Sequence, residues 1–302
     1  MNASLPPDRV TVVVMTRNRW PDLCNSLPRH EAPVILVDNG STDGTPELVR
    51  KHFPHVDVVE LADNHGSVAR NIGVQRVRTP YVAFADDDSW WAPGALAAAV
   101  EVLDRHPRLA VLAGHMLVGP DERPDAICAL LADSPLGTAD DLPGPSILGF
   151  LACGAVVRAD AYLAAGGFDD VIFFMGEEER LALDLVTLGW GLAYVDSIVA
   201  HHHPSPVRDA LDRQSRGARN ALLTAVLRRP WPVVLRAVAS NLKAGAAGRL
   251  AIRRALPALL RALLRRRQIS PELEAARRLL DSDRAVITPR RSPPSASARS
   301  PR

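Results

Sequence analysis

Short hydrophobic runs that end in polar turns recur through the N-terminal part of the chain. Val34–Val37 leads into Asp38-Asn-Gly-Ser, and Tyr81–Phe84 leads into Ala85 and the acidic cluster Asp86-Asp-Asp88. Runs of this length with helical stretches between them are typical of a sheet built from strand–helix units. Because ligands bind beyond the carboxyl ends of parallel strands, we expect Asp38 and Asp86–Asp88 to lie at one binding edge.

The pattern predicts an α/β fold, a mostly parallel sheet with helices on both faces. We expect strands at Val10–Val14, Val34–Val37, Val56–Val59, Tyr81–Phe84, Leu109–Ala113 and Leu192–Val195, and regular structure of unspecified type at Gly154–Arg158. We expect helices at Pro21–His30, Thr45–His52, Val68–Val77, Pro93–His106 and Glu177–Gly189. The Pro- and Asp-rich stretch Gly119–Pro145 is expected to be a long loop and a candidate cover for an acceptor site.

Composition and charge change along the chain. The 302 residues are 47% hydrophobic and 23% charged, a normal globular mixture, and the formal charge of +2 does not call for nucleic acid. The acidic residues gather before Asp212, and the segment from Arg213 to Gln268 contains no Asp or Glu. We therefore expect three parts: a catalytic domain at 8–205, a basic helical extension at 206–281 and a disordered tail at 282–302.

Cysteine usage and the N-terminal segment favour a reducing, cytoplasmic setting. The three cysteines are scattered and lack the close spacing of a zinc site or a disulfide scaffold. Residues Met1–Arg9 contain no apolar stretch, and Val10–Met15 is far shorter than the roughly 20 residues that cross a bilayer. We therefore expect neither a signal peptide nor a membrane-spanning helix.

The basic extension contains an amphipathic helix. Leucines recur at helical spacing at 256, 259, 260, 263 and 264, with arginines at 254, 261 and 265 on the opposite side. Such a helix suits an anionic membrane surface better than a phosphate ladder, so we expect peripheral attachment to the inner face of a membrane. The alternative is that the leucines pack on the catalytic domain.

The acidic cluster is a candidate metal site. Asp86 and Asp88 follow a strand that would hold them rigidly, and carboxylate oxygens suit Mg²⁺ or Mn²⁺. Such an ion bridges the phosphates of a nucleoside diphosphate and neutralises the charge on the leaving group. We take Asp88 as the direct ligand and Asp86 as directed toward the nucleotide; the alternative is a solvated acidic turn before Pro93.

An ordered series of motifs resembles the inverting family-2 glycosyltransferases with the GT-A fold. The series comprises Thr16-Arg-Asn-Arg19, Asp38-Asn-Gly-Ser-Thr-Asp-Gly44, Asn64-His-Gly66, Ala69-Arg-Asn71, Asp86-Asp-Asp88, Gly166-Gly-Phe-Asp169 and Gly176-Glu-Glu178. It covers roughly residues 8–205. The resemblance implies a donor site that holds a nucleoside-diphosphate-sugar on Thr16, Arg17, Asn18, Asp38, Asn39, Ser41, Gly66, Arg70, Asn71, Asp86 and Asp87.

The resemblance also implies individual roles within that donor site. Asp38 matches the carboxylate that accepts a hydrogen bond from the nucleotide base, although an Asx turn explains the same residues. Asn39 stands where many relatives have Asp, which leaves the base unspecified. Arg70, at a helix start, would meet a phosphate or a base edge; a plain surface arginine is the alternative.

Glu177 and Glu178 match the family's general base, which removes the proton of the acceptor hydroxyl. A neighbouring carboxylate and the apolar run Phe173–Met175 would raise the pKa of such a base toward neutrality. Glu178 replaces the usual Asp, so the choice between the two glutamates stays open. Acids that stabilise a helix N-terminus are the simpler explanation.

The remaining motifs concern the metal and the acceptor. His201–His203 end a strand and therefore cannot all face one side. Relatives often carry one histidine near the diphosphate, and we take His202 as a candidate metal ligand. The choice among the three stays open, and a surface histidine run is the alternative. Gly167 and Phe168 match the family's acceptor-side loop, although a plain turn fits as well. Trp91 is a candidate for stacking on a sugar, and a core role is the alternative.

We expect a metal-dependent, inverting transfer of a hexosyl or deoxyhexosyl group from a nucleoside-diphosphate-sugar to a hydroxyl of a glycan or lipid-linked acceptor. Synthesis of cell-surface glycan, glycolipid or polysaccharide would fit. A nucleotidyltransferase is disfavoured because no glycine-rich loop follows the first strand, where Met15–Trp20 stands instead. A catalytically inactive scaffold or membrane-surface binding module is the second alternative, against which the intact Asp86, Asp88 and Glu178 argue.

Overall fold

The computed structural model describes residues 9–204 and 210–287. The strands are β1 (Val10–Thr16), β2 (Val34–Asp38), β3 (Asp57–Glu60), β4 (Tyr81–Asp86), β5 (Ser89–Trp91), β6 (Leu109–Val118), β7 (Arg123–Pro124), β8 (Ala155–Arg158) and β9 (Gly191–His202). The α-helices are α1 (Trp20–Ser26), α2 (Thr45–His52), α3 (Ala69–Arg76), α4 (Ala95–Arg105), α5 (Ala126–Ala132), α6 (Ala159–Ala164), α7 (Glu177–Thr187), α8 (Ala210–Arg228), α9 (Trp231–Lys243), α10 (Gly245–Leu264) and α11 (Pro271–Ile287). Short 3₁₀ helices lie at Leu27–Arg29, Gly66–Val68 and Ala152–Gly154.

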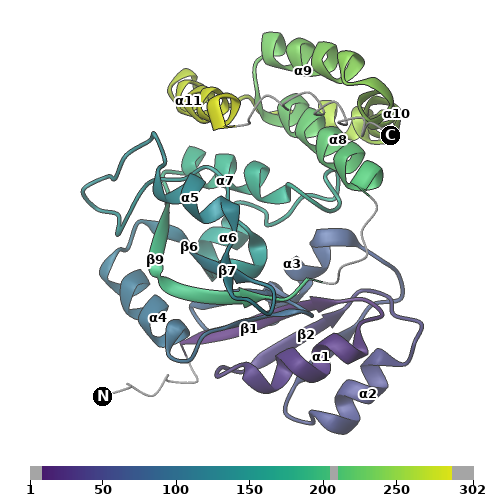
Figure 1. The fold of residues 1–302 in the computed structure, drawn as a ribbon, viewed down its shortest axis with the longest axis vertical. Helices are drawn as coiled ribbons and strands as arrows, with labels where there is room; N and C mark the ends of the chain where they lie inside the picture. The colour runs from purple at the N-terminus through teal and green to yellow at the C-terminus, as the bar shows by residue number, and fades with distance from the viewer. Residues whose placement is uncertain (1–8, 205–209, 288–302) are drawn as a thin grey trace, which may run out of the picture.

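The described strands form one sheet in the order β3-β2-β1-β4-β8-β6-β9-β5, with β7 beside β6. The strands β3, β2, β1 and β4 are parallel, as expected. Beyond β4 the sheet is mixed, because β8 runs antiparallel to both β4 and β6 while β9 is parallel to β6. Helices cover the sheet on both sides (Figure 1).

The central strands place the candidate site residues. Four valines of β1 are fully buried, as expected for a strand covered on both faces. In the pairing register Thr16 lies opposite Asp38, and Met15 lies opposite Asp86. Three polar strand ends therefore meet at one edge of the sheet, which confirms the position expected for Asp38 and Asp86.

The stretch Gly119–Pro145 is more regular than expected. It contains β7, which pairs with β6, and helix α5, whose N-cap is Asp125. The Asp125 carboxylate accepts a hydrogen bond from the Ile127 N–H at 2.9 Å. We missed this helix because its one amphipathic turn is flanked by the prolines and aspartates that usually mark loops. β5, which contains Trp90 and Trp91, was missed as well because it is only three residues long.

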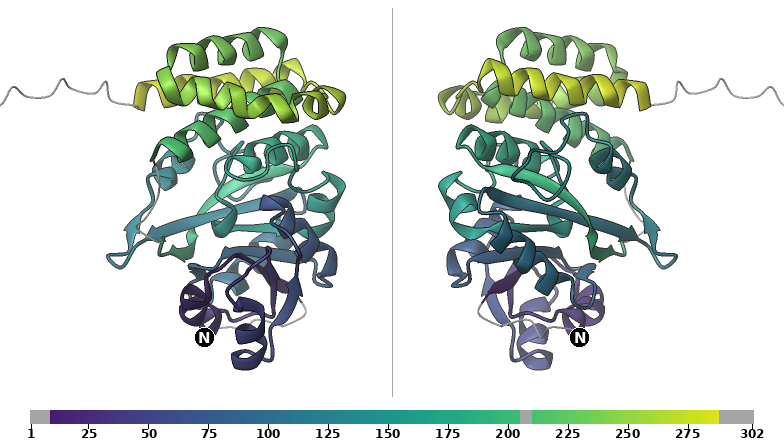
Figure 2. Two further views of the ribbon diagram at one scale, coloured as in Figure 1. Left: turned by 90° about the vertical axis from the view of Figure 1, so that its right-hand side faces the viewer. Right: turned by 90° about the vertical axis from the view of Figure 1, so that its left-hand side faces the viewer.

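Helices α8–α11 form an extension at one end of the molecule, opposite the N-terminal end of the described chain (Figure 2). α8, α9 and α10 share a hydrophobic core that also takes in Val171 and Ile172 of the catalytic domain. α11 continues through Ile287, six residues past the expected end of the extension at 281. The rest of the expected tail lies outside the described residues.

Helix α10 packs with its small residues inward. Its buried side chains are Ala247, Ala251, Ala255, Ala258 and Ala262, together with Gly248. The arginine side faces acidic residues: Arg254 pairs with Asp212, and Arg261 and Arg265 pair with Asp170 of the catalytic domain. Most of the leucine stripe is exposed, and only Leu259 packs partly into the core. The alternative that the leucines pack on the catalytic domain is therefore wrong for most of the stripe.

Among the described residues, no helix is both long enough and apolar enough to cross a membrane.

Candidate active site

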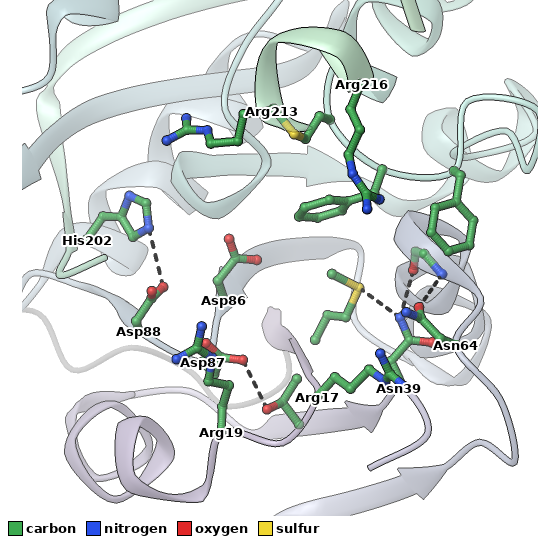
Figure 3. A pocket seen from close by; sticks show the side chains of 16 residues that line it. Arg17, Arg19, Asn39, Asn64, Asp86, Asp87, Asp88, His202, Arg213 and Arg216 are labelled. Carbon is green, nitrogen blue, oxygen red and sulfur yellow. Dashed lines mark hydrogen bonds and ion pairs between the residues drawn. The ribbon is translucent and has the colours of Figure 1, made fainter. Parts of the chain in front are cut away.

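A cavity of about 430 Å³ opens at the polar edge of the sheet. Side chains from the strand ends line one side of it, and the first turns of α8 reach over it (Figure 3). The lining residues are Met15, Thr16, Arg17, Arg19, Asn39, Asn64, Gly66, Asp86, Asp87, Asp88, Phe173, Phe174, Met175, His202, Arg213 and Arg216. The cavity thus combines three carboxylates with four arginines, a composition that fits a diphosphate held with a cation.

The three aspartates of the acidic cluster have different partners. Asp86 ends β4, and its carboxylate is paired with the buried Arg70. Asp87 accepts a hydrogen bond from the Thr16 hydroxyl at 3.1 Å. Burial raises the pKa of Asp87 well above its usual value, and the charges of Asp88 and Asp86 add to that shift. An arrangement that crowds carboxylates in this way favours a bound cation.

Asp88 and His202 approach each other across the cavity floor. His202 Nε2 lies 3.3 Å from Asp88 Oδ1 (Figure 3). Single ligand atoms of Asp86, His202 and Cys153 all lie within 4.8 Å of one another. The Asp86 carboxylate and the His202 imidazole suit a divalent ion such as Mg²⁺ or Mn²⁺, and Asp88 places a second carboxylate next to His202. Burial raises the pKa of the Cys153 thiol well above its usual value, and sulfur is in any case a softer ligand than Mg²⁺ or Mn²⁺ prefers.

The histidine run alternates as expected for the end of a strand. His202 faces the cavity, whereas His201 and His203 face the opposite side and contact Glu122 at 2.6 and 3.1 Å. The Trp90 ring stacks on His201 with ring centroids 5.4 Å apart. Of the three histidines, His202 is therefore the one placed to act in the site.

Asp38 lies beneath the cavity and does not line it. It is fully buried, and its carboxylate accepts hydrogen bonds from the Ser41 N–H at 2.8 Å and from the Ser41 hydroxyl. This is the Asx turn that we weighed as the alternative. Asn39 lines the cavity instead, and its side chain holds the Asn64–Gly66 loop through the His65 N–H and the Gly66 carbonyl.

The predicted residues of the first loop are only partly in the cavity. Arg17 and Arg19 line it. Asn18, at φ 55°, donates its N–H to the Ser41 hydroxyl and accepts from the Thr42 N–H, each at 2.8 Å. Asn18 and Ser41 therefore hold two loops of the cavity wall together and are not among its lining residues.

Arg70 is not at the protein surface. Only 2% of its side chain is exposed, and it lies between Asp86 and Glu177, with Nη1 3.5 Å from Glu177 Oε1. The expectation that Arg70 meets a phosphate or a base edge is wrong for this structure. Its physical role is to supply a counter-charge to the half-buried Asp86 and to face the buried Glu177 carboxyl.

Asn71 and the Gly167-Phe168 segment form one internal contact. The Asn71 amide donates to the Phe168 carbonyl at 2.8 Å and accepts from the Phe168 N–H at 2.9 Å. A Cβ on Gly167 would lie 2.5 Å from Asn71 Oδ1, so the close approach requires glycine. The Phe168 ring is buried against Phe84. Asn71 therefore does not line the donor cavity, and Phe168 belongs to the core.

Trp91 also belongs to the core. It is 2% exposed, and its indole N–H donates to the Phe84 carbonyl at 3.2 Å. The expectation that it stacks on an acceptor sugar is wrong, because β5 pairs with β9 and turns this side chain inward.

The two candidate base residues differ in their surroundings. Glu177 is buried beside Arg70, and burial together with the charge of Glu178 raises its pKa to about 8. Burial also raises the pKa of Glu178, whose carboxylate accepts a hydrogen bond from the Ala152 N–H at 3.2 Å. Both shifts have the direction expected of a general base at neutral pH.

Of the two candidate bases, Glu178 borders a second cavity of about 160 Å³, and Glu177 does not. This second cavity lies between α5, the segment 147–150, the start of α7 and α11, and its other walls include Ile127, Leu131, Leu148 and Phe150. The expected acceptor-side stretch 119–145 therefore contributes α5 to a cavity that contains a candidate base.

The segment before α7 was not predicted as a cavity wall. Phe173 and Met175 have φ values of 70° and 75°, a strained conformation for residues with side chains. The Asn220 amide of α8 holds the segment by donating to the Phe174 and Met175 carbonyls, each at 2.6 Å. Sequence patterns reveal neither the positive φ nor the contact with α8.

Arg213 and Arg216 are the other unpredicted lining residues. They come from α8, outside the expected catalytic domain, and extend over the cavity opposite the aspartates (Figure 3). Arg216 pairs with Asp212 at 2.6 Å. The acid-free segment after Asp212 was the available signal, but its periodicity does not show which arginines meet the cavity.

The comparisons with known proteins define the class to which this fold and site belong. The model of the family described as "Glycosyl transferase family 2" matches residues 11–163. That span is about half of the chain and contains the strands that carry the acidic cluster. The chain therefore belongs to glycosyl transferase family 2, has the GT-A fold and is a glycosyltransferase.

Among particular relatives, the N-acetylglucosaminyl-diphospho-decaprenol L-rhamnosyltransferase of Mycobacterium tuberculosis is 30% identical over 236 residues, 65% of this chain and 76% of the relative. A mannosyltransferase of Pyrobaculum calidifontis, solved with GDP-mannose and Mn²⁺, superimposes with a TM-score of 0.57 at 23% identity, covering 92% of this chain and 80% of that one. TarS of S. aureus with UDP-GlcNAc gives 0.59 at 17% identity, covering 92% and 90%. These two structures show the fold alone.

Proposed function

We propose that this protein transfers a hexosyl or deoxyhexosyl group from a nucleoside-diphosphate-sugar to an acceptor hydroxyl, with inversion at the anomeric carbon. The observation that carries the proposal is the cavity in which Asp86, Asp88 and His202 face Arg213 and Arg216. Anionic and cationic side chains on opposite sides can hold a metal diphosphate between them.

The donor would lie with its diphosphate between the aspartates and the arginines. A divalent ion, Mg²⁺ or Mn²⁺, held by Asp88, Asp86 and His202 would supply charge neutralisation to the departing diphosphate. Arg213 and Arg216 would bind the phosphate oxygens from the other side. Thr16 would hold Asp87 in place, and Asn39 and Gly66 would shape the wall next to the nucleoside.

Glu178 is the better candidate for the general base. Glu177 is enclosed with Arg70, whereas Glu178 borders the second cavity, which we propose as the acceptor entrance. The acceptor oxygen would attack the anomeric carbon while its proton passes to Glu178. The bond from that carbon to the phosphate oxygen breaks, and its electron pair leaves with the nucleoside diphosphate. One displacement inverts the anomeric centre and needs no covalent sugar–enzyme intermediate.

A similarity supports the choice of acceptor class: the related M. tuberculosis protein is an N-acetylglucosaminyl-diphospho-decaprenol L-rhamnosyltransferase. We propose a lipid-linked glycan acceptor and a role in cell-surface glycan, glycolipid or polysaccharide synthesis. The protein would then work in the cytoplasm, at the inner face of a membrane. The inactive-scaffold alternative loses support because the carboxylates of the site are present and face a cavity.

The first test is thermal unfolding with UDP, GDP, dTDP or CDP, each with Mn²⁺, Mg²⁺ or a chelator. A ligand that binds only the folded state raises its stability, so one nucleotide should raise the melting temperature, and the chelator should remove the effect. Asp88→Asn should abolish the metal-dependent part. The proposal fails if no nucleotide stabilises the protein with either metal. Anomeric configuration of the product, read by NMR, then tests inversion.

A further inference from the structure

The outer helices of the extension carry large apolar side chains on their solvent side. On α10 the exposed fractions are 60% for Leu256, 67% for Leu260 and 78% for Leu264. On α9, which packs against α10, Leu235 is 66% exposed and Trp231 is 50% exposed. These helices lie at the end of the molecule farthest from the N-terminal strands (Figure 2).

This exposure follows from how α10 packs. Its buried stripe consists of alanines and one glycine, which let it lie close to α8, so the larger leucines remain on the outer side. A helix stabilised only by the burial of its apolar face would be turned the other way. The leucines contribute little to the core of the extension. Their exposure is therefore accounted for by contact with a surface outside this chain.

The same outer surfaces carry cations that lack acidic partners among the described residues. On α10, Arg249 and Arg253 share the face of Leu256 and Leu260, because the positions 249, 253, 256 and 260 are spaced by three or four. On α9, Arg236 and Lys243 are exposed as well. By contrast, Arg254, Arg261 and Arg265 on the inner side of α10 are all paired with aspartates.

We infer that the outer face of α9 and α10, defined by Trp231, Leu235, Arg249, Arg253, Leu256, Leu260 and Leu264, docks on an anionic lipid membrane. Leucine and tryptophan side chains would enter the headgroup region, and the free cations would bind lipid phosphates. The inference deepens the proposed function, on which it rests for the lipid-linked nature of the acceptor.

A second copy of this chain fits the face less well. In a two-fold symmetric dimer the same patch contacts itself, so these cations would meet cations. The sequence from Arg213 to Gln268 has no Asp or Glu that could relieve the repulsion. An anionic lipid surface supplies the missing negative charge, and charge complementarity therefore selects the membrane.

The test is co-sedimentation of the full-length protein with vesicles, without nucleotide or metal. One set of vesicles contains phosphatidylglycerol and phosphatidylcholine, and the other contains phosphatidylcholine alone. We expect binding to the anionic set that weakens as salt is raised. The double variants Leu256→Ser/Leu260→Ser and Arg249→Gln/Arg253→Gln should each lower the fraction bound about tenfold.

Matched control variants change exposed side chains of the same types elsewhere. Leu163→Ser/Leu188→Ser removes two exposed leucines of the catalytic domain, and Arg78→Gln/Arg105→Gln removes two of its exposed arginines. Both controls should bind vesicles as the unmodified protein does. Equal loss in the controls and the α10 variants overturns the assignment of this face.

Two other outcomes also overturn the inference. One is the absence of binding to anionic vesicles. The other is a dimer of the unmodified protein that the α10 variants convert to monomer, without vesicle binding. Nucleotide-dependent stabilisation, measured on the same samples, keeps this failure separate from failure of the transferase proposal. If the protein binds nucleotide but no vesicles, only the inference of a docking surface fails.

Discussion

The Arg70 guanidinium lies against the Glu177 carboxyl, and both side chains are buried beneath the cavity that Asp86–Asp88 line. Arg70 Nη1 lies 3.5 Å from Glu177 Oε1, both side chains are at most 3% exposed, and the other arm of the guanidinium pairs with Asp86. One arginine thereby links the acidic strand end, where the metal would bind, to the start of α7, which carries the candidate base. Removing the charge of either carboxylate will therefore change the electrostatic surroundings of the other.

We predict that Arg70→Met lowers the free energy of unfolding by about 1–3 kcal/mol, because it removes the counter-charge of the half-buried Asp86 and the polar group that faces the buried Glu177 carboxyl. Urea unfolding at pH 7 measures the loss. Arg17→Gln, which changes an exposed arginine of the cavity rim, should cost less than about 0.5 kcal/mol. The double change Arg70→Met/Glu177→Gln should be less damaging than the sum of the two single changes. If the two single losses of unfolding free energy simply add, Arg70 and Glu177 do not interact.

The raised pKa of Glu177 predicts a pH dependence of stability. A carboxyl whose folded pKa is about 8, against an ordinary value of 4.5, keeps its proton in the folded state after the unfolded chain has lost it. The free energy of unfolding should therefore fall as pH rises from about 5 to 8. Glu177→Gln should flatten that slope, whereas Glu47→Gln, on the exposed side of α2, should leave it unchanged. Denaturant titrations at a series of pH values provide the measurement.

Gly66 should be required by the close approach of the segment before α7. A Cβ at this position would lie 2.3 Å from the Phe173 carbonyl oxygen. Gly44 has a similarly positive φ of 81° but no neighbour within 4 Å of the same added atom. Both Gly→Ala changes bear the strain of the left-handed conformation, about 1 kcal/mol. Only Gly66→Ala should also weaken nucleotide binding, measured by calorimetry, and an equal effect at Gly44 would refute the contact.

The order of strands and helices could be predicted from the sequence because buried strands such as Val10–Thr16 carry an uninterrupted apolar signal. The acidic cluster was also predictable, since a strand end fixes the position of Asp86. What the sequence could not show is the direction of side chains in the loops. Three residues of motifs that match the family are turned inward: Asp38, Arg70 and Asn71. Asp38 binds Ser41 within its own turn, whereas Arg70 and Asn71 contact residues distant in the sequence.

The sequence also could not show which parts of the extension complete the site. Arg213 and Asn220 sit on one helix in an acid-free segment whose composition suggests only a basic surface. Their contacts with the cavity and with the Phe174 carbonyl depend on how α8 packs against the catalytic domain. The buried face of α10 could not be predicted either. Its alanines alternate with larger leucines, and the sequence does not show that the alanines are the buried residues.

The two arginines of α8 should contribute to binding of the diphosphate. We predict that Arg213→Gln weakens the affinity for the stabilising nucleoside diphosphate by about tenfold, as expected for loss of one charge-assisted phosphate contact. The corresponding nucleoside, which lacks phosphates, should bind both proteins equally. Arg78→Gln, on the opposite part of the catalytic domain surface and outside the cavity lining, is the control. Isothermal titration at two salt concentrations should show a smaller salt dependence for the α8 variant.

The roles of the two glutamates of α7 can be separated by kinetics. Glu178→Gln should retain metal-dependent nucleotide binding and lower transfer by a factor of about 10²–10⁴, the usual contribution of a general base. Because burial raises the pKa of Glu178, kcat of the unmodified enzyme should rise with pH as this carboxyl loses its proton, and the variant should lack that rise. Glu177→Gln should keep more activity and change stability instead, since its carboxyl is enclosed with Arg70. If Glu177→Gln abolishes transfer while Glu178→Gln leaves it intact, the second cavity is not the acceptor entrance and the base is the buried residue.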